Sequence, residues 1–288
     1  MANETELANI GHATDEVSDG ITAALVNSVV VLPQIYSENL PSDSMVKLFR
    51  KAGSLAAAIV AESAGAAANA EYTETEITAT AQKHAVVSRL TVEAQTFSRI
   101  TNERLIMEQG MGLARDIDDE ITSLFGSFAT SVDAGVSMDT DSLMDAVFSV
   151  YNSNAGGNRQ LIADLDYAQA NDIRKALLNS GAAVFAQPQQ TTLLAGAPSA
   201  NGYIGQLPGL DCYQFTADTG GGNDIGLVFN PDMAFGSMIS PGVQTRVRWV
   251  GDSDGGGTAG FYDELASWIF FDVVEWNDLA GCQVLSDS

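Results

Sequence analysis

Apolar residues recur at steps of three and four positions between Thr91 and Phe125. The residues of this stripe are Phe97, Ile100, Met107, Met111, Ala114, Ile117, Ile121 and Leu124. Such spacing is typical of an amphipathic helix that places one face in a core. Thr91 is suited to cap the start of this helix, and Gly126 is suited to end it. The pattern therefore predicts one continuous helix over 91–125, roughly 50 Å long.

A different pattern precedes the helix. Residues 71–87 predict a strand with polar side chains on both faces, because Glu74 and Glu76 alternate with threonines. A strand with so little apolar surface is not buried in its own domain. A two-stranded hairpin alone is only marginally stable in water. We therefore expect residues 53–89 to form a projecting hairpin that a partner molecule supports.

The remaining predicted elements are shorter. Residues 1–45 predict a weak helix followed by a β-prone run, which suits an arm that lies on another part of the molecule. Residues 45–52 predict one or two turns of basic amphipathic helix, and further helices are expected over 139–151 and 158–181. Short strands are expected within 182–187, 191–196, 202–215, 226–240, 243–264 and 267–285, with part of 226–240 in a short helix or turn.

Composition narrows the class of protein. The chain has 288 residues, of which 45% are hydrophobic, so it can bury a core, and its net charge is −24. A protein that binds the phosphates of nucleic acid needs Lys and Arg side chains, so this acidic composition disfavours such binding. No sequence-specific nucleic-acid binding is predicted. Eight of the thirteen basic residues lie between residues 47 and 115, and none lies in the first 46. This asymmetry suits head-to-tail contacts between copies of one chain.

One stretch imitates a metal-binding motif. Asp252, Asp254 and Asp263 fall at positions 1, 3 and 12 of a calcium loop. The glycines between them and the strand before them favour a hairpin loop, so these aspartates are a lesser candidate for a metal site. The only histidines, His12 and His84, do not form a zinc site or a general base with partners. No cofactor and no catalytic residue is predicted.

The chain gives no sign of export or of a membrane span. Its first residues lack a basic region followed by an apolar run, and no stretch is long and apolar enough to cross a bilayer. Two alternatives stay open for Cys212 and Cys282: they meet across strands, or they are separate buried thiols, as is usual in a reducing cytoplasm.

The order of the elements resembles that of tailed-bacteriophage major capsid proteins with the Hong Kong-97-type fold. An acidic hairpin is followed by a long helix, a mixed α/β middle and a strand-rich return over 202–215, 229–240, 247–252 and 268–276. The resemblance covers essentially the whole chain, and it is one of layout. It implies an α+β fold with an N-terminal arm (1–52), an E-loop hairpin (53–90), the spine helix of a peripheral domain (91–126), an axial domain (127–215) and a return through the peripheral domain (216–288).

The resemblance implies a shell subunit that is not an enzyme. Such a major capsid protein self-assembles as hexamers and pentamers into the icosahedral shell of a virion, which encloses a phage double-stranded DNA genome. Assembly in the host cytoplasm, a portal, a separate scaffolding protein and a decoration protein are also implied. Two alternatives stay open: an encapsulin-like nanocompartment shell, and an acidic halophilic cytosolic enzyme with an unrecognised site.

The charges predict which surfaces of neighbouring subunits meet. The acidic residues of the second hairpin arm are Glu71, Glu74 and Glu76, and the basic residues along the long helix and its approach are Arg89, Arg99, Arg104 and Arg115. A projecting arm cannot reach its own helix beyond the hairpin base, so we expect the two sets to meet between subunits. The family's type member also links subunits through an E-loop lysine. Residues 53–82 contain no lysine, so we expect contacts without covalent bonds.

Overall fold

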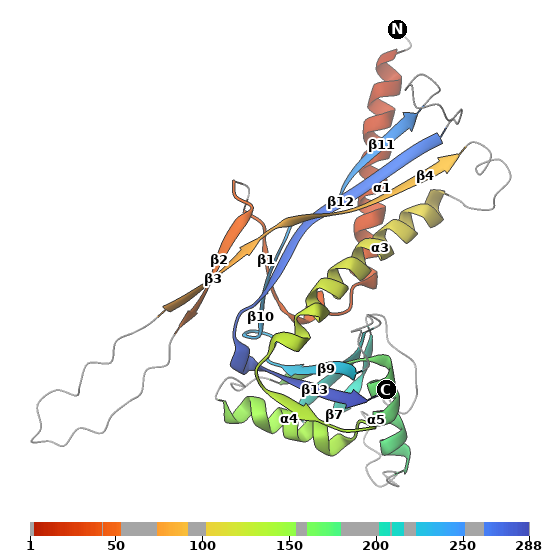
Figure 1. Cartoon of the computed structure of the whole chain (residues 1–288). Coiled ribbons are helices and arrows are strands. Elements are labelled where there is room, and N and C mark those ends of the chain that lie inside the picture. The colour runs from red at the N-terminus through yellow and green to blue at the C-terminus, as the bar shows by residue number, and fades with distance from the viewer. Residues whose placement is uncertain are drawn as a thin grey trace, which may run out of the picture.

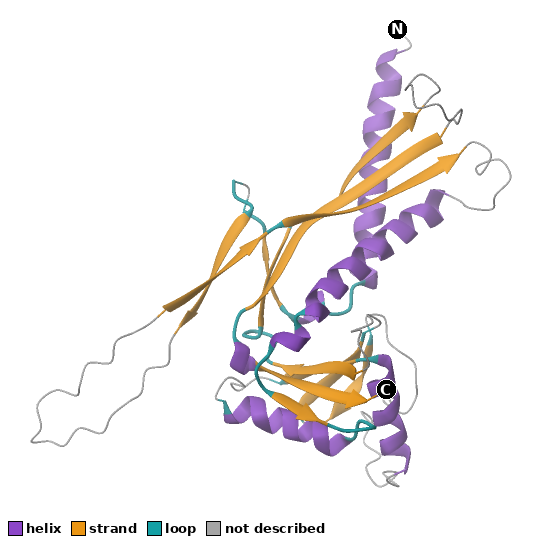
Figure 2. Cartoon of the chain, viewed as in Figure 1, coloured by secondary structure: helices purple, strands orange, loops and turns teal. Residues whose placement is uncertain are grey.

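The structure is a computed structural model that describes residues 3–41, 43–52, 74–91, 102–153, 160–179, 202–207, 209–215, 223–250 and 262–287. Within these ranges, a five-stranded sheet and two long helices form the upper part of Figure 1, and a six-stranded sheet with two shorter helices forms the lower part. A two-stranded ribbon projects to one side. Figure 2 separates these helices and strands by colour.

The helices are α1 (Asn3–Ser28), α3 (Asn102–Ser123), α4 (Thr140–Asn152) and α5 (Tyr167–Asn179), with 3-10 turns η1 (Leu32–Gln34), η2 (Phe125–Ser127) and η4 (Asp278–Ala280). The five-stranded sheet contains β1 (Tyr36–Asn39), β4 (Gln82–Thr91), β10 (Phe235–Ile239), β11 (Gln244–Val250) and β12 (Tyr262–Glu275). The six-stranded sheet has the order β5 (Ser131–Asp133), β13 (Gly281–Asp287), β9 (Asn223–Phe229), β6 (Leu161–Leu165), β8 (Leu210–Gln214) and β7 (Tyr203–Leu207). The ribbon is β2 (Val46–Ala52) with β3 (Glu74–Thr80).

Strand β12 is the axis of the five-stranded sheet. Its first half pairs with β11, its second half pairs with β10, and β4 lies along its other edge, all antiparallel. Helices α1 and α3 cover one face and bury Leu25, Leu113 and Ile117 against that sheet. The two helices approach closely at Gly110, where a Cβ atom would come within 2.5 Å of the Cβ of Ala24. Helix packing therefore explains why a glycine stands at position 110 inside α3.

A second core lies between the six-stranded sheet and helices α4 and α5. It buries Leu143 and Val150 of α4 and Ile173 of α5 against β6, β8 and β13. Helix α4 begins with a side-chain cap, in which Asp139 accepts a hydrogen bond of 2.8 Å from the Ser142 amide. The helix expected over 139–151 is confirmed.

An aromatic cluster joins the two bodies. Phe125 in η2 packs edge-on against Phe215, with ring centroids 5.5 Å apart, and Phe235 at the start of β10 packs edge-on against Phe128 at 5.3 Å and Phe229 at 5.5 Å. The chain also passes directly from β12 through η4 into β13, so one segment belongs to both sheets. Side-chain packing and chain connectivity therefore hold the bodies together.

The long helix is shorter than its apolar pattern predicts. Helix α3 covers Asn102–Ser123, and Thr91 is the last residue of β4, where it pairs with Tyr262. The prediction that Thr91 caps the helix is wrong, because β12 offers the 82–91 segment a ladder of backbone hydrogen bonds. Of the predicted stripe, Phe97 and Ile100 lie outside the described residues, and Met107 is 57% exposed. Leu113, which the stripe omitted, is fully buried.

Two other helical predictions are wrong, and tertiary packing explains both. Of the predicted helix over 45–52, Val46–Ala52 forms β2, because Phe49 is buried on one face of the ribbon while β3 supplies the backbone partners. The segment expected as a helix over 158–181 begins with β6 at Leu161–Leu165, an apolar run in the interior of the six-stranded sheet, and only then continues as α5.

The predicted strands agree better with the structure than the predicted helices do. Strands β7 and β8 confirm the turn-rich β segment at 202–215, and β11, β12 and β13 confirm the strands late in the chain. The helix or short turn expected within 226–240 is a turn followed by β10. The early weak helix is α1, and the β-prone run after it contains η1 and leads into β1. The strands expected at 182–187 and 191–196 lie outside the described residues.

Candidate intersubunit interface

The projecting ribbon of β2 and β3 rests on the rest of the described chain at its root alone. In β2 and β3, Phe49 and Ala79 face the body and lie with Met238 of β10 in a small buried cluster. The opposite face carries Val46 and Leu48, which are 45% and 47% exposed. Two apolar side chains on a solvent-facing ribbon form a surface suited to contact with another molecule.

Phe49 anchors the ribbon to the five-stranded sheet. Its ring lies 5.9 Å from the ring of Trp276, and a Cβ atom at Gly236 would come within 2.7 Å of it. Gly236 therefore leaves the space that the aromatic ring fills. At the same root, the Thr80 amide donates a hydrogen bond of 2.5 Å to Asp272 of β12, and Lys47 forms an ion pair with Glu38. The root is fixed, whereas the outer face of the ribbon has no cover within the described chain.

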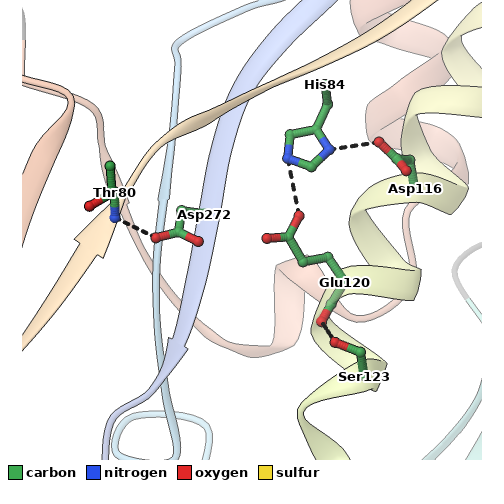
Figure 3. A network of polar contacts seen from close by, with 6 residues as sticks. All are labelled: Thr80, His84, Asp116, Glu120, Ser123 and Asp272. Atoms are coloured by element: carbon green, nitrogen blue, oxygen red, sulfur yellow. Dashed lines mark hydrogen bonds and ion pairs between the residues drawn. The ribbon is translucent and has the colours of Figure 1, made fainter.

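A polar clamp of His84, Asp116 and Glu120 lies beside the ribbon root (Figure 3). His84 comes from the start of β4, and the two carboxylates lie one helical turn apart on α3. The Nδ1 atom of His84 is 2.6 Å from Oδ2 of Asp116, and its Nε2 atom is 3.1 Å from Oε2 of Glu120. The clamp ties the strand that leads out of the ribbon to the long helix.

The clamp holds a positive charge on the histidine. The contact with Glu120 raises the pKa of His84 to about 9, with Asp116 adding to the effect and burial opposing it. The ring edge also packs on Phe271, with centroids 6.0 Å apart. Without this imidazolium, the carboxylates of Asp116 and Glu120 and the nearby Asp272 would face one another with no cation between them.

The face of the five-stranded sheet that lies opposite α1 and α3 carries basic side chains. The register places Lys83, Val87 and Arg89 of β4 beside alternate residues of β12, and Arg246 of β11 on the other side of β12. The ammonium of Lys83 lies 4.3 Å from the ring centroid of Trp268. Lys83, Arg89 and Arg246 are exposed, and Val87 is 56% exposed. We name Lys83, Val87, Arg89, Arg246 and Trp268 the basic sheet face.

The described residues that were predicted to make intersubunit contacts lie on three elements, β3, β4 and α3. Glu74 and Glu76 are on exposed positions of β3, and Glu76 forms an ion pair of 3.1 Å with Arg50 of β2. Arg89 is on β4, 3.2 Å from Glu264 of β12. Glu71 and Arg99 lie outside the described residues.

Arg104 and Arg115 are on α3, as expected, but the helix around them is acidic. Arg104 forms an ion pair of 3.8 Å with Glu108 one turn on. The sequence of α3 has two arginines and six carboxylates. The structure therefore places two predicted basic residues on an acidic helix and Arg89 on the basic sheet face. Charge and spacing along the sequence do not group Lys83 with Arg246, because only strand register brings these two residues onto one surface.

Only one of the three candidate metal residues lies in the described part of the chain, so the candidate metal site stays a prediction. Asp263 lies in β12, paired with Leu90 and Trp249, and Asp252 and Asp254 lie outside the described residues. Across the described ranges, no group of three or more histidine, cysteine, aspartate or glutamate side chains could hold a metal ion. In the same ranges, no helix has the length and apolar character to cross a membrane.

Cys212 and Cys282 are buried free thiols. Of the two alternatives that the sequence leaves open, separate buried thiols are therefore confirmed, and a pair that meets across strands is not.

Comparison with solved structures finds similar chains in bacteriophage capsids. The capsid structure of Ralstonia phage GP4 matches with a TM-score of 0.65 and 9% identity, over 88% of this chain and 87% of that chain. The acidic stable capsid structure of Helicobacter pylori bacteriophage KHP30 matches with a TM-score of 0.62 and 12% identity, again over 88% and 87% of the two chains. A virus-like particle from Pyrococcus furiosus matches with a TM-score of 0.53 and 6% identity, over 94% and 99%.

No family model and no curated protein matches the sequence. The likeness is therefore carried by the arrangement of elements, which agrees with the resemblance of layout noted in the sequence. At these low identities the comparisons establish the fold, and the expected likeness to phage capsid proteins is confirmed at that level: this chain has the fold of the subunits in these bacteriophage capsid structures.

Proposed function

We propose that this protein is the major capsid protein of a tailed bacteriophage with the Hong Kong-97-type fold. In this proposal it assembles as hexamers and pentamers into an icosahedral shell around double-stranded DNA, in the host cytoplasm, as a structural protein and not an enzyme. The observation that carries the proposal is the match to phage capsid subunits over most of both chains. A portal and a separate scaffolding protein belong to the proposal as partners, and a decoration protein does so as a further one.

The proposed parts of the subunit follow the layout of the family. The N-terminal arm (1–52), the E-loop hairpin (53–90), the spine helix (91–126), the axial domain (127–215) and the return (216–288) are retained as a proposal. The pairing of β2, which ends at Ala52, with β3 supports an earlier start for the hairpin. In the proposal the hairpin therefore starts near Val46.

The proposed contact between subunits joins the ribbon of one copy to the body of the next. The ribbon projects away from its own body, and its exposed face combines apolar Val46 and Leu48 with the acidic strand β3 (Figure 1). A head-to-tail contact of this kind repeats around a closed ring, so modest energies at each contact add up over a shell. Glu71, although outside the described residues, extends the acidic strand in the sequence.

The basic sheet face is the better receiver for the acidic ribbon. A helix with six carboxylates and two arginines repels Glu74 and Glu76, whereas Lys83, Arg89 and Arg246 attract them. This choice revises the expectation that the neighbour's helix, with Arg99, Arg104 and Arg115, receives the hairpin. The proposal now places Arg89 in the contact and leaves the other three outside it.

A nanocompartment shell is the second candidate function. The match to the Pyrococcus furiosus virus-like particle supports it, because that match spans nearly the whole of both chains. The same assembly experiment separates the candidates. The protein expressed alone, and again with its neighbouring genes, is purified and imaged by negative-stain electron microscopy, and particle contents are assayed for DNA and for co-purifying protein.

Shells or ring-shaped capsomers are expected, with DNA inside the particles formed from the complete gene set. Shells that contain a protein cargo and no DNA would favour the nanocompartment. A monodisperse monomer under all assembly conditions would contradict both. In denaturing gels, shells should give one band near the 30.2 kDa of the chain, and a ladder of multimers would contradict the expectation of non-covalent contacts.

The receiving surface is tested by charge reversal. Lys83→Glu with Arg246→Glu should block assembly of a folded subunit, whereas the matched pair Arg104→Glu with Arg115→Glu should leave assembly intact. Sedimentation reports assembly, and circular dichroism confirms the fold of each variant. If only the variant Arg104→Glu with Arg115→Glu failed to assemble, the neighbour's helix would again be the expected receiver of the hairpin.

A further inference from the structure

Helix α4 lies below the six-stranded sheet, on the side away from the five-stranded sheet (Figure 1). Its buried residues, such as Leu143 and Val150, pack against the six-stranded sheet. Its exposed surface carries three further apolar side chains, Met144, Phe148 and Tyr151, which are 40%, 69% and 39% exposed. They follow one another at steps of four and three positions, so they lie in one row along the helix. We name these three residues the apolar row.

The apolar row has a neighbour where the helix ends. The hydroxyl of Ser153, the C-cap of α4, donates a hydrogen bond of 2.7 Å to the carbonyl of Leu279 in η4. Leu279 is itself 47% exposed. Single apolar side chains are common on protein surfaces, whereas several that follow one helix and its end form a patch of the kind that marks an interaction site.

Two carboxylates run beside the apolar row. Asp141 and Asp145 are exposed and stand four positions apart, so they lie on one line of the helix. Asp141 is three positions before Met144, and Asp145 is three positions before Phe148, so each lies next to a member of the apolar row. The sequence of α4 contains no Lys or Arg. The exposed surface of α4 therefore combines an apolar row with an acidic row.

A partner for this surface needs apolar and basic groups in a matching arrangement. The two carboxylates repel the phosphates of nucleic acid and the headgroups of an anionic membrane. Side chains at steps of three and four on one helix pack between those of another helix. The complement of the α4 surface is therefore an amphipathic helix with an apolar stripe and a row of Lys or Arg beside it.

A second copy of this chain offers no such helix among its described residues. Helices α1 and α4 contain no Lys or Arg, and α3 has two arginines among six carboxylates. Arg174 and Lys175 of α5 are adjacent in sequence, so they do not form a row along that helix. Lys175 also forms an ion pair of 3.0 Å with Asp172. The charges therefore favour a helix from a second protein.

We propose that α4 docks a basic amphipathic helix of a second protein, with Phe148 as the anchor. The apolar stripe of that helix covers Met144, Phe148 and Tyr151, and its Lys or Arg side chains lie opposite Asp141 and Asp145. Because the patch is small, the contact is weak and reversible. This docking surface goes beyond the proposed function and does not depend on it.

Binding is measured on the unassembled full-length subunit by fluorescence anisotropy of a labelled peptide of 13 residues, the length of α4. The peptide contains only Leu and Lys, with its leucines at steps of three and four. One comparison peptide has the same composition with Leu and Lys in alternation, which favours a strand, and the other has Glu in place of Lys.

Saturable binding of the helical basic peptide is expected, at least about tenfold tighter than the binding of either comparison peptide. Equal binding of the alternating peptide would show attraction by net charge alone and would overturn the proposal. Absence of saturable binding would overturn it as well.

A pair of aromatic variants locates the anchor. Phe148→Ser should weaken binding of the helical basic peptide at least about tenfold. Tyr167→Ser removes an aromatic side chain of similar exposure, 64%, from the neighbouring helix α5 and should leave binding unchanged. Circular dichroism checks the fold of each variant. Undiminished binding by a folded Phe148→Ser subunit would place the peptide elsewhere and contradict the proposal.

A pair of charge variants tests the acidic row. Asp141→Asn with Asp145→Asn should weaken binding about fivefold, because two ion pairs with the peptide are lost. Glu16→Gln with Asp19→Asn makes the same change of net charge at exposed positions of α1 and should have little effect. Equal losses in the two double variants would mean that the peptide responds to net charge and not to α4, which would overturn the proposal.

Sedimentation of the subunit with no other protein present distinguishes a second protein from a second copy. Phe148→Ser should associate with itself as the wild type does. Loss of self-association in Phe148→Ser would assign the apolar row to a contact between copies and would overturn the proposal. Because the peptide titration uses the unassembled subunit, its failure can be told apart from failure of the proposed shell function.

Discussion

The body and the ribbon of this protein are held in very different ways. The body has two large cores and an aromatic cluster in which Phe235 contacts three other phenylalanines. The ribbon has one buried aromatic residue, Phe49, and leaves Val46 and Leu48 on an exposed face. The difference indicates that the body folds on contacts within its own chain, whereas the ribbon has few such contacts, and the proposed contact with a neighbour would add to its stability. Damage to the body should therefore lower the free energy of unfolding of the subunit more than damage to the ribbon.

The largest effect is expected at the aromatic cluster. Phe235→Ala should lower the free energy of unfolding by about 3–5 kcal/mol, because it removes a fully buried ring and leaves a cavity. Denaturant titration followed by circular dichroism measures this loss. A loss below about 1 kcal/mol would mean that the cluster does not hold the bodies together. Phe148→Ala, at an exposed position of α4, is the matched control and should change little.

A smaller global effect is expected at the ribbon anchor. Phe49→Ala should lower the free energy of unfolding by about 1–2 kcal/mol, because the ribbon can open locally while the body stays folded. Hydrogen exchange should show faster exchange in β2 and β3 and unchanged exchange in β12. Equal loss of protection in ribbon and body would contradict the distinction between the two regions. Leu48→Ala, on the exposed face of the same strand, is the control for the subunit.

The clamp at the ribbon root should make stability depend on pH. Because the pKa of His84 is raised to about 9, its contribution is fully present below about pH 6.5 and is lost as pH rises through about 9. His84→Gln should therefore cost about 1–2 kcal/mol at pH 6, a figure reduced for the solvent exposure of Asp116, and almost nothing at pH 10.

The measurement is denaturant unfolding of wild type and His84→Gln at pH 6, 8 and 10. Asp116→Asn should reproduce part of the loss with the same direction of pH dependence. A difference between wild type and His84→Gln that stays constant over this range would show that His84 acts through its size and not through its charge.

The smallest effect on the subunit is expected from the acidic strand of the ribbon. Glu74→Lys with Glu76→Lys should change the free energy of unfolding by less than about 1 kcal/mol, because both side chains are exposed. Under the proposed function, assembly should nevertheless fail, because the proposed contact would repeat across the shell. Sedimentation beside circular dichroism measures both properties, and normal shells would mean that these charges face only solvent. Partial rescue by Lys83→Glu with Arg246→Glu would identify the partner surface.

The sequence predicted the general layout because long periodic patterns survive tertiary packing. The amphipathic part of α3, the capped helix α4 and the strands late in the chain follow this rule. Short segments do not follow this rule, because their secondary structure depends on the segments with which they pair and pack. The segment of β2 became a strand through Phe49 and β3, and Leu161–Leu165 became one through its place inside a sheet.

The site residues were harder to predict for the same reason. Glu74, Glu76 and Arg89 were singled out by charge alone, and the contact they make with a neighbour is still a prediction. Strand register is what groups Lys83 with Arg246, and no local pattern signals it. One signal for the clamp was present in the sequence, since Asp116 and Glu120 stand one helical turn apart, but their partner His84 lies 32 residues before Asp116.

The place of β12 and β13 in the sequence has a consequence for synthesis of the protein. Both sheets require the 262–287 segment, because β12 is the axis of one and β13 joins β5 to β9 in the other. On the ribosome, residues of the ribbon emerge long before either sheet can close, so a nascent chain cannot yet offer a neighbour a finished surface. Many contacts of the fold also join residues far apart in sequence, which slows folding. Under the proposed function, translation would thus separate folding from assembly in time and limit premature contacts between unfinished chains.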